Sequence, residues 1–143
     1  MRKTLGYKLF GSGKIPAGLR TELQSELIEA SDEGIHGSVT YKNYKAPGKR
    51  DGWRRVWFSG AIAVTGTRLV GLQHGKYVVN VPFADDRFRL MNISLEPTDT
   101  ILIAFDASLF HADWSGQIEY RFRTPLAQSV LQAIQRHTPF AHY

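Results

Sequence analysis

The 143-residue chain contains no cysteine, and this absence rules out several kinds of chemistry. Without thiols there is no disulfide framework, no thiolate metal site and no cysteine nucleophile. Long apolar runs are missing as well, because the short apolar stretch after Arg2 and Lys3 stops at Gly11–Lys14. A signal peptide needs a longer apolar core, and a membrane-spanning helix needs about 20 such residues. We therefore expect a cytoplasmic protein without a transmembrane segment.

A recognisable catalytic motif is also lacking. Ser108 and Ser115 have no nucleophile-elbow or triad context. His111 and Asp113 would share one face of a strand and could serve metal binding or proton transfer. Two ligands do not make a site, however, and no third ligand can be identified, so we interpret the pair as exposed surface residues. The sequence thus predicts no enzyme activity, no metal and no cofactor.

Charge is distributed unevenly along the chain. The segment from Lys42 to Arg55 carries six bases and one acid, a net charge of +5 that equals the net charge of the whole chain. Upstream, residues 21–33 hold five acids and no base. Such a polarised chain presents a local basic surface. The six bases are the candidate ligand-binding residues for an anionic group: Lys42, Lys45, Lys49, Arg50, Arg54 and Arg55.

The N-terminal region predicts an arm followed by one helix. We expect the first 15 residues, which include several glycines and lysines, to be loosely held. The next segment, which begins at Pro16 and ends near Ser31, has the apolar spacing of an amphipathic helix. The apolar face of this helix would consist of Leu19, Leu23, Leu27 and Ile28.

From Ile35 onward, apolar and polar residues alternate with the period of two that is typical of half-buried strands. Trp53–Phe83 is the most strongly patterned stretch and predicts three strands joined by tight turns. About seven short antiparallel strands follow one another, and this pattern favours a barrel or sandwich. The expected strands include residues 35–44, 53–64, 68–72, 76–83, 88–95, 101–105 and 118–123, with a further alternation at 110–114. A break at 46–48 and a turn at 49–52 separate the first two strands, and Glu119, Arg121 and Arg123 face outward in the last.

The second of these strands is apolar on both faces, so something should cover each face. Trp57, Ala61 and Ala63 line its outer face. We expect the N-terminal helix to cover them. If it does not, they could form a protein interface.

The last element is a helix that begins after Thr124, a suitable N-cap residue, and Pro125. Its apolar stripe consists of Leu126, Val130, Leu131 and Ile134. The expected fold class is therefore mainly β: a bent seven-stranded antiparallel barrel capped by a C-terminal α-helix, with an extra N-terminal helix. We expect one globular unit, in which residues 1–34 form an arm and helix packed on the barrel of residues 35–143.

Two segments resemble pleckstrin-homology (PH) domains. Residues 37–42 (GSVTYK), a basic loop and residues 53–58 (WRRVWF) look like the opening hairpin of such domains. Residues 60–70 (GAIAVTGTRLV) resemble the strand-turn-strand signature of bacterial PH-like and GRAM-like domains. The similarity covers residues 35–137 and implies a strongly bent seven-stranded barrel capped by a helix.

The details of this resemblance indicate a branch of the superfold. Lys42 and Arg54 match positions used by lipid-binding PH domains, whereas Val56 stands where a further arginine would be. The last helix also lacks the tryptophan that is typical of eukaryotic PH domains. The resemblance is therefore to the bacterial or GRAM-like branch.

The basic cluster is compatible with several partners. Its arginines could hold phosphate groups in bidentate contacts, and at an anionic membrane each base contributes about 1 kcal/mol. Tyr41, Tyr44 and Trp53 interleave with the bases, as a nucleic-acid stacking platform requires, although aromatic residues at strand ends more often pack in a core. The cluster could equally be a solvated loop, or be masked by the acidic helix.

The sequence therefore favours a non-enzymatic PH-like binding module. Its expected partner is another protein or a second copy of the chain, and an anionic membrane surface is a further candidate. The alternative is a β-barrel that binds nucleic acid or a small ligand. A small barrel enzyme, with a pocket around His111, Asp113 and Asp106, is the least favoured.

Overall fold

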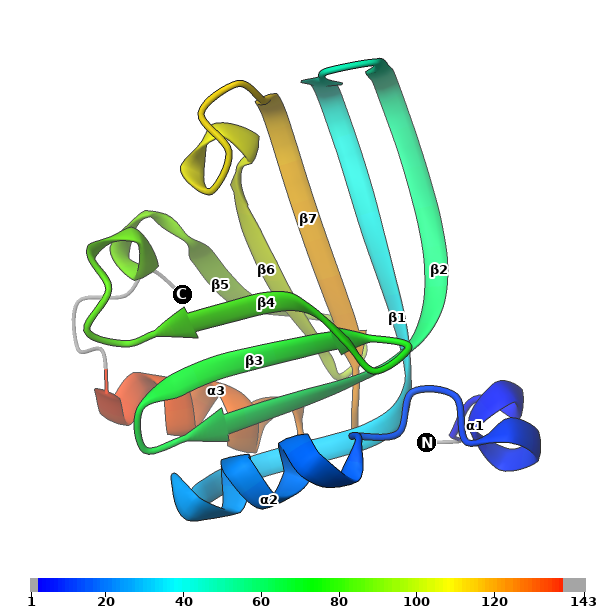
Figure 1. Cartoon of the computed structure of the whole chain (residues 1–143), viewed down its shortest axis with the longest axis vertical. Coiled ribbons are helices and arrows are strands. Elements are labelled where there is room, and N and C mark those ends of the chain that lie inside the picture. The colour runs from blue at the N-terminus through cyan, green and yellow to red at the C-terminus, as the bar shows by residue number, and fades with distance from the viewer. Residues whose placement is uncertain (1–2, 138–143) are drawn as a thin grey trace.

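The computed structural model describes residues 3–137. Seven antiparallel strands form one sheet that is curled into a half-barrel, with helices packed around it (Figure 1). The strand order is β4-β3-β2-β1-β7-β6-β5, so β1 lies in the middle and pairs with both β2 and β7. The predicted fold class, a bent seven-stranded sheet with a C-terminal helix and an N-terminal helix, is confirmed. The strands are β1 Ile28–Ala46, β2 Lys49–Thr65, β3 Arg68–Gln73, β4 Lys76–Pro82, β5 Asn92–Glu96, β6 Thr100–Asp106 and β7 Ser115–Arg123.

The two longest strands, β1 and β2, form a hairpin whose turn lies at the end of the molecule opposite the helices α2 and α3 (Figure 1). Pro47 and Gly48 close this hairpin, and Ala46 pairs directly with Lys49. Gly48 has a φ of +75°, a backbone conformation that glycine adopts without a steric penalty. The chain therefore turns within the expected break at residues 46–48, but the expected extension of the turn to residues 49–52 is wrong, because these residues already belong to β2.

The main core fills the inner side of the curled sheet. Ile62, Ile103 and Phe122, from three different strands, are completely buried there. Phe58 packs edge-on against Phe122, with ring centroids 5.8 Å apart. Along each strand, apolar side chains that face the core thus alternate with side chains that face outward, as the sequence pattern predicts.

One end of the half-barrel is closed by α3, Ala127–His137 (Figure 1). Before this helix, Thr124 Oγ1 accepts a hydrogen bond from the backbone N–H of Leu126 and donates one to Asp32 Oδ2 at 2.7 Å. Thr124 therefore fixes the start of the helix and ties it to β1. Leu126, expected in the apolar stripe, is instead exposed. The buried residues of the helix are Ala127, Val130, Ala133 and Ile134.

The N-terminal arm is more ordered than predicted, because it contains a short helix, α1, Leu5–Phe10. The Thr4 side chain caps this helix, and Gly11 ends it at a φ of +72°. Thr4 also anchors the arm to the sheet: its N–H donates to the carbonyl of Gly34 at 2.8 Å, and its hydroxyl lies 2.5 Å from the Ser59 hydroxyl. These contacts hold the arm against β1 and β2.

The second helix, α2, Ala17–Ser25, ends earlier than predicted. Leu27 has a φ of +66°, which breaks the helix, and Ile28 already begins β1. The N–H of Gly66 donates to the carbonyls of Glu26 and Leu27. The turn between β2 and β3 thus holds the chain where it leaves the helix.

The outer face of β2 is covered by α2 only in part. Leu23 of this helix is completely buried against Ala61 and Ala63, as the sequence predicts. Trp57 lies on the same face of the strand but outside this contact, and it remains 69% exposed.

Residues 88–90 and 110–114, which are expected in strands, have other structures. The first three belong to a 3₁₀ helix, η1, Asp86–Leu90, and a second 3₁₀ helix, η2, Ala107–Leu109, precedes residues 110–114. The carboxylates of Asp85 and Asp106 each accept a hydrogen bond from the backbone N–H two residues on, which stabilises a turn instead of a strand. Residues 110–114 then form a turn, not the expected strand.

The division of the chain into an arm and helix, residues 1–34, and a barrel, residues 35–143, stays a prediction. Strand β1 crosses the boundary between these two segments. The outer ends of the two expected units, residues 1–2 and 138–143, lie outside the described residues.

Candidate functional site

Three adjacent strands present polar and aromatic side chains on the outer face of the half-barrel. Side chains alternate along a strand, so the two neighbours of the core residue Val39 point outward. The strand register places Ser38 of β1 beside Trp57 of β2 and Arg121 of β7. The adjoining rungs are Thr40 with Arg55 and Glu119, and His36 with Ser59 and Arg123.

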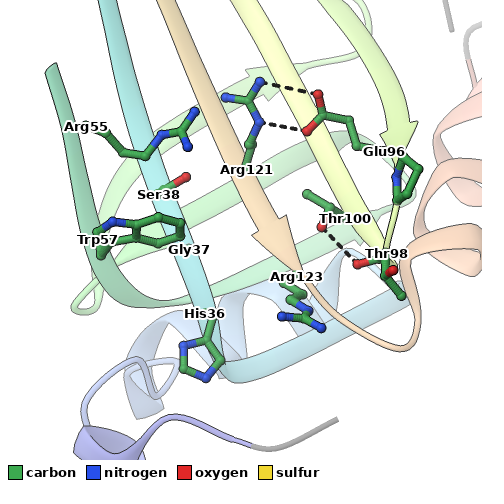
Figure 2. A pocket seen from close by; sticks show the side chains of 11 residues that line it. His36, Gly37, Ser38, Arg55, Trp57, Glu96, Thr98, Thr100, Arg121 and Arg123 are labelled. Atoms are coloured by element: carbon green, nitrogen blue, oxygen red, sulfur yellow. Dashed lines mark hydrogen bonds and ion pairs between the residues drawn. The ribbon is translucent and has the colours of Figure 1, made fainter. Parts of the chain in front are cut away.

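An open groove of about 570 Å³ lies over these rungs (Figure 2). Trp57 and Arg55 form one side, the turn between β5 and β6 forms the other, and Ser38 lies between them (Figure 2). We call this the outer groove. It is lined by His36, Gly37, Ser38, Arg55, Trp57, Glu96, Pro97, Thr98, Thr100, Arg121 and Arg123.

Arg121 is held by two carboxylates. Its Nε donates to Glu96 Oε1 at 2.7 Å, and its Nη1 donates to Glu119 Oε1 at 3.0 Å (the Glu96 pair is drawn in Figure 2). The hydrogen bond with Glu96 is the main cause that raises the pKa of Arg121. Burial raises the pKa of Glu119, but hydrogen bonds from Lys42 and Arg121 outweigh it and lower that pKa overall. The two acids therefore balance Arg121 and Lys42.

Two further arginines of the outer groove, Arg55 and Arg123, are not neutralised by a carboxylate within residues 3–137. Arg55 donates from Nε to Thr40 Oγ1 at 2.8 Å, and its guanidinium lies over the rings of Trp53 and Trp57, 5.3 and 5.7 Å from their centroids. Within residues 3–137, neither Arg55 nor Arg123 forms an ion pair. The groove therefore carries an excess of positive charge.

Ser38 is an unusual residue of the groove floor. It is 1% exposed, and its hydroxyl has no hydrogen-bond partner among the described residues. A buried polar group without a partner costs about 1–3 kcal/mol, so such groups are rare in folded proteins. An orphaned hydroxyl in the lining of a cationic groove is suited to bind a ligand oxygen.

The six bases singled out in the sequence do not meet at one site. Lys42 and Arg55 lie on the outer face of the sheet. Arg54 points to the opposite face and pairs with Asp51 at 3.7 Å. The remaining three are exposed at the far end of the β1–β2 hairpin: Lys45, Lys49 and Arg50. Their role in ligand binding stays a prediction.

The acidic helix does not mask the basic hairpin. Glu22 and Glu26 instead pair with Arg68 at the start of β3, the latter at 2.9 Å. Tyr41 and Tyr44, considered above for stacking, pack together near Trp114 and are largely buried. Trp53 is the one member of that predicted aromatic set that is exposed, at 61%.

The residues considered for catalysis lie away from the outer groove. His111 and Asp113 are exposed in the turn before β7, and the His111 ring stacks on Trp114. Asp106 accepts hydrogen bonds from the N–H and hydroxyl of Ser108, which lower its pKa. The described part of the chain contains no group of three or more His, Asp or Glu residues that could hold a metal ion.

Sequence reasoning missed most of the groove: it did not select Ser38, Trp57, Arg121 and Arg123 as site residues. Each lies at an outward position of an expected strand, and polar or aromatic residues at such positions could have been chosen as candidates for a ligand-binding surface. Ser38 and Arg121 are 83 positions apart, and only the pairing of β1 with β7 brings them together.

The chain matches none of the protein-family models and none of the curated proteins with which it was compared. Within residues 3–137, no helix has both the length and the apolar character needed to cross a membrane.

Proposed function

We propose that this protein is a non-enzymatic binding module that recognises an anionic group on its partner through the outer groove. The observation that carries this proposal is the juxtaposition of the orphaned Ser38 hydroxyl with two arginines, Arg55 and Arg123, that form no ion pair within residues 3–137. A hydroxyl donor and planar guanidinium groups are the donors that phosphate and carboxylate oxygens accept.

The chemistry of the groove supports binding rather than catalysis. Its carboxylate, Glu96, is engaged by Arg121 through two hydrogen bonds, at 2.7 and 3.3 Å. Both carboxylate oxygens are thus occupied by the Arg121 guanidinium and do not face a ligand as free acceptors. The hydroxyl, guanidinium and imidazole groups that make up the other polar side chains of the groove can each donate a hydrogen bond to an anionic ligand.

We also propose that the module is of the bacterial PH-like or GRAM-like type and acts in the cytoplasm. The curled seven-stranded sheet and the closing helix support this assignment. Besides the anionic ligand of the groove, we propose that such a module binds another protein or a second copy of the chain. Light scattering over a range of protein concentrations tests the second possibility.

The anion proposal can be tested by NMR titration with inorganic phosphate, with sodium chloride at matched ionic strength as the reference. We expect phosphate-specific changes at the amide of Ser38 and the guanidinium groups of Arg55 and Arg123. The double variant Arg55→Gln, Arg123→Gln should lose them. The control Lys45→Ala, Lys49→Ala removes the same charge from the hairpin end and should keep them. Equal losses in both variants, or no phosphate-specific change in the native protein, would contradict the proposal.

The hairpin end offers a second candidate surface. Lys45, Lys49 and Arg50 are exposed there and form no ion pair among the described residues. At about 1 kcal/mol per base, such a cluster gives a weak, salt-sensitive attachment to an anionic membrane. Sedimentation with phosphatidylserine vesicles at low and physiological salt tests it, and absence of binding at both would exclude it.

A further inference from the structure

The outer face of β2 carries an unusual pair of aromatic side chains next to the groove. Trp53 and Trp57 are 61% and 69% exposed, although tryptophan is highly buried on average. Arg55 lies between them, at the intervening outward position, and contacts both rings. Burying the apolar surface of an exposed indole is favourable. A ligand that covers these rings would therefore be stabilised by apolar contact as well as by neutralisation of its charge.

We propose that the outer groove and this tryptophan pair bind single-stranded nucleic acid, with a backbone phosphate near Ser38 and Arg123 and with bases stacked on Trp57 and Trp53. This proposal rests on the proposed function and names its ligand. A base has a flat ring face whatever its identity, so stacking on an indole combines with phosphate contacts in a sequence-tolerant way.

The spacing of the two indoles favours a chain of nucleotides over a single one. Residues four apart on a strand are separated by about 13 Å, which is further than one base can span. A mononucleotide would therefore use Trp57 and the groove but leave Trp53 unoccupied. An oligonucleotide that runs along β2 can contact both rings.

The charges on this face fit a flexible polyanion. Lys42, opposite Trp53, and Arg121 are balanced by Glu119 and Glu96, and this leaves Arg55 and Arg123 in excess. Two phosphate contacts on a single strand give a slope of about −1.4 for the logarithm of the binding constant against the logarithm of salt concentration. The expected binding is thus salt-dependent but not purely electrostatic.

Fluorescence anisotropy with a labelled oligothymidine of about ten nucleotides tests the proposal, with inorganic polyphosphate of matched charge and thymidine monophosphate as competitors. We expect the oligonucleotide to bind at least about tenfold more tightly than either competitor. Trp57→Ala should weaken oligonucleotide binding by about tenfold and leave polyphosphate binding unchanged, whereas Trp57→Phe should retain most of the affinity. Leu90→Ala, which truncates another exposed apolar residue away from the groove, is the matched control.

The outcomes separate this inference from the proposed function. If polyphosphate binds as tightly as the oligonucleotide and Trp57→Ala changes neither affinity, the groove binds anions but the nucleic-acid assignment is wrong. Equal affinity for thymidine monophosphate overturns the single-strand assignment in the same way. If no anion binds and the phosphate titration is silent, the proposed function fails as well. Thermal unfolding of Trp57→Ala and Trp57→Phe confirms that both variants are folded.

Discussion

The outer face of β2 combines two different surfaces on one strand. Toward the C-terminal end of the strand, Ala61 and Ala63 are small, and Leu23 of α2 packs directly on them. Toward the hairpin end, Trp53 and Trp57 project from the same face, and both remain exposed. Side-chain size thus separates a half that is closed by the chain's own helix from a half that is open to a partner. Four predictions test this difference.

The largest effect is expected in the covered half. Leu23→Ala should lower the free energy of unfolding by about 2–5 kcal/mol, because Leu23 is completely buried and its removal leaves a cavity between α2 and β2. Urea denaturation measures the change. Leu90→Ala, at a residue that is 66% exposed, should change stability by less than about 0.5 kcal/mol. Similar effects of the two substitutions would show that α2 does not seal this half.

The ion pair that anchors α2 should contribute a smaller, pH-dependent stability. Hydrogen bonds from the Arg68 guanidinium lower the pKa of Glu26 below its ordinary value of 4.5. Its stabilising contribution is therefore present above that value and is lost as the pH falls through the lowered pKa. Glu26→Gln should cost about 1–2 kcal/mol at pH 7 and progressively less below about pH 4.

Denaturation at neutral and acidic pH measures this difference. Glu22→Gln is the control, because Glu22 contacts the same arginine at 3.4 Å but is 60% exposed, so its substitution should cost little. A cost for Glu26→Gln that does not change with pH would contradict the assigned role of the carboxylate.

In the open half, a substitution is expected to raise stability. Ser38→Ala removes a buried hydroxyl that has no hydrogen-bond partner within residues 3–137 and should stabilise the protein by about 1 kcal/mol. The same variant should weaken phosphate binding in the NMR titration. Ser129→Ala, at an exposed position of α3, should change neither property. Lower stability of Ser38→Ala would indicate that the hydroxyl has a structural partner.

The smallest effect on stability is expected for Trp57→Ala. Its side chain is largely exposed, so the free energy of unfolding should change by less than about 0.5 kcal/mol even though oligonucleotide binding is weakened about tenfold. Denaturation under the same conditions as for Leu23→Ala gives the direct comparison between the two halves. A loss above about 2 kcal/mol would mean that the indole supports the fold.

Local sequence patterns were enough to predict the sheet, the closing helix and the cover over Ala61 and Ala63, because alternation and helical spacing are properties of neighbouring residues. The helix end near Leu27 was not predicted, since the leucine spacing continues past the positive φ at that residue. The same limit applies to residues 49–52, which follow the predicted break at residues 46–48: their polar sequence favours a turn, yet they pair with β1 as a strand. In both places tertiary contacts override the local pattern.

The groove illustrates a different limit. The sequence marks Arg121 and Arg123 as outward-facing, but it does not give the register of β7 on β1. A count of basic residues along the chain likewise ignores the alternation that points Arg54 and Arg55 to opposite faces of the strand. An orphaned hydroxyl such as that of Ser38 depends on every neighbouring atom, so it can be recognised only in three dimensions.

The position of β1 in the sheet links the groove floor to the folding equilibrium of the whole molecule. β1 joins the two halves of the sheet, so its amide protons should exchange with solvent only when the protein unfolds globally. A ligand that binds the floor then slows exchange at Ser38 by the same factor by which it stabilises the native state, one plus the ligand concentration over Kd. Exchange at this amide therefore measures ligand affinity without a label on either partner.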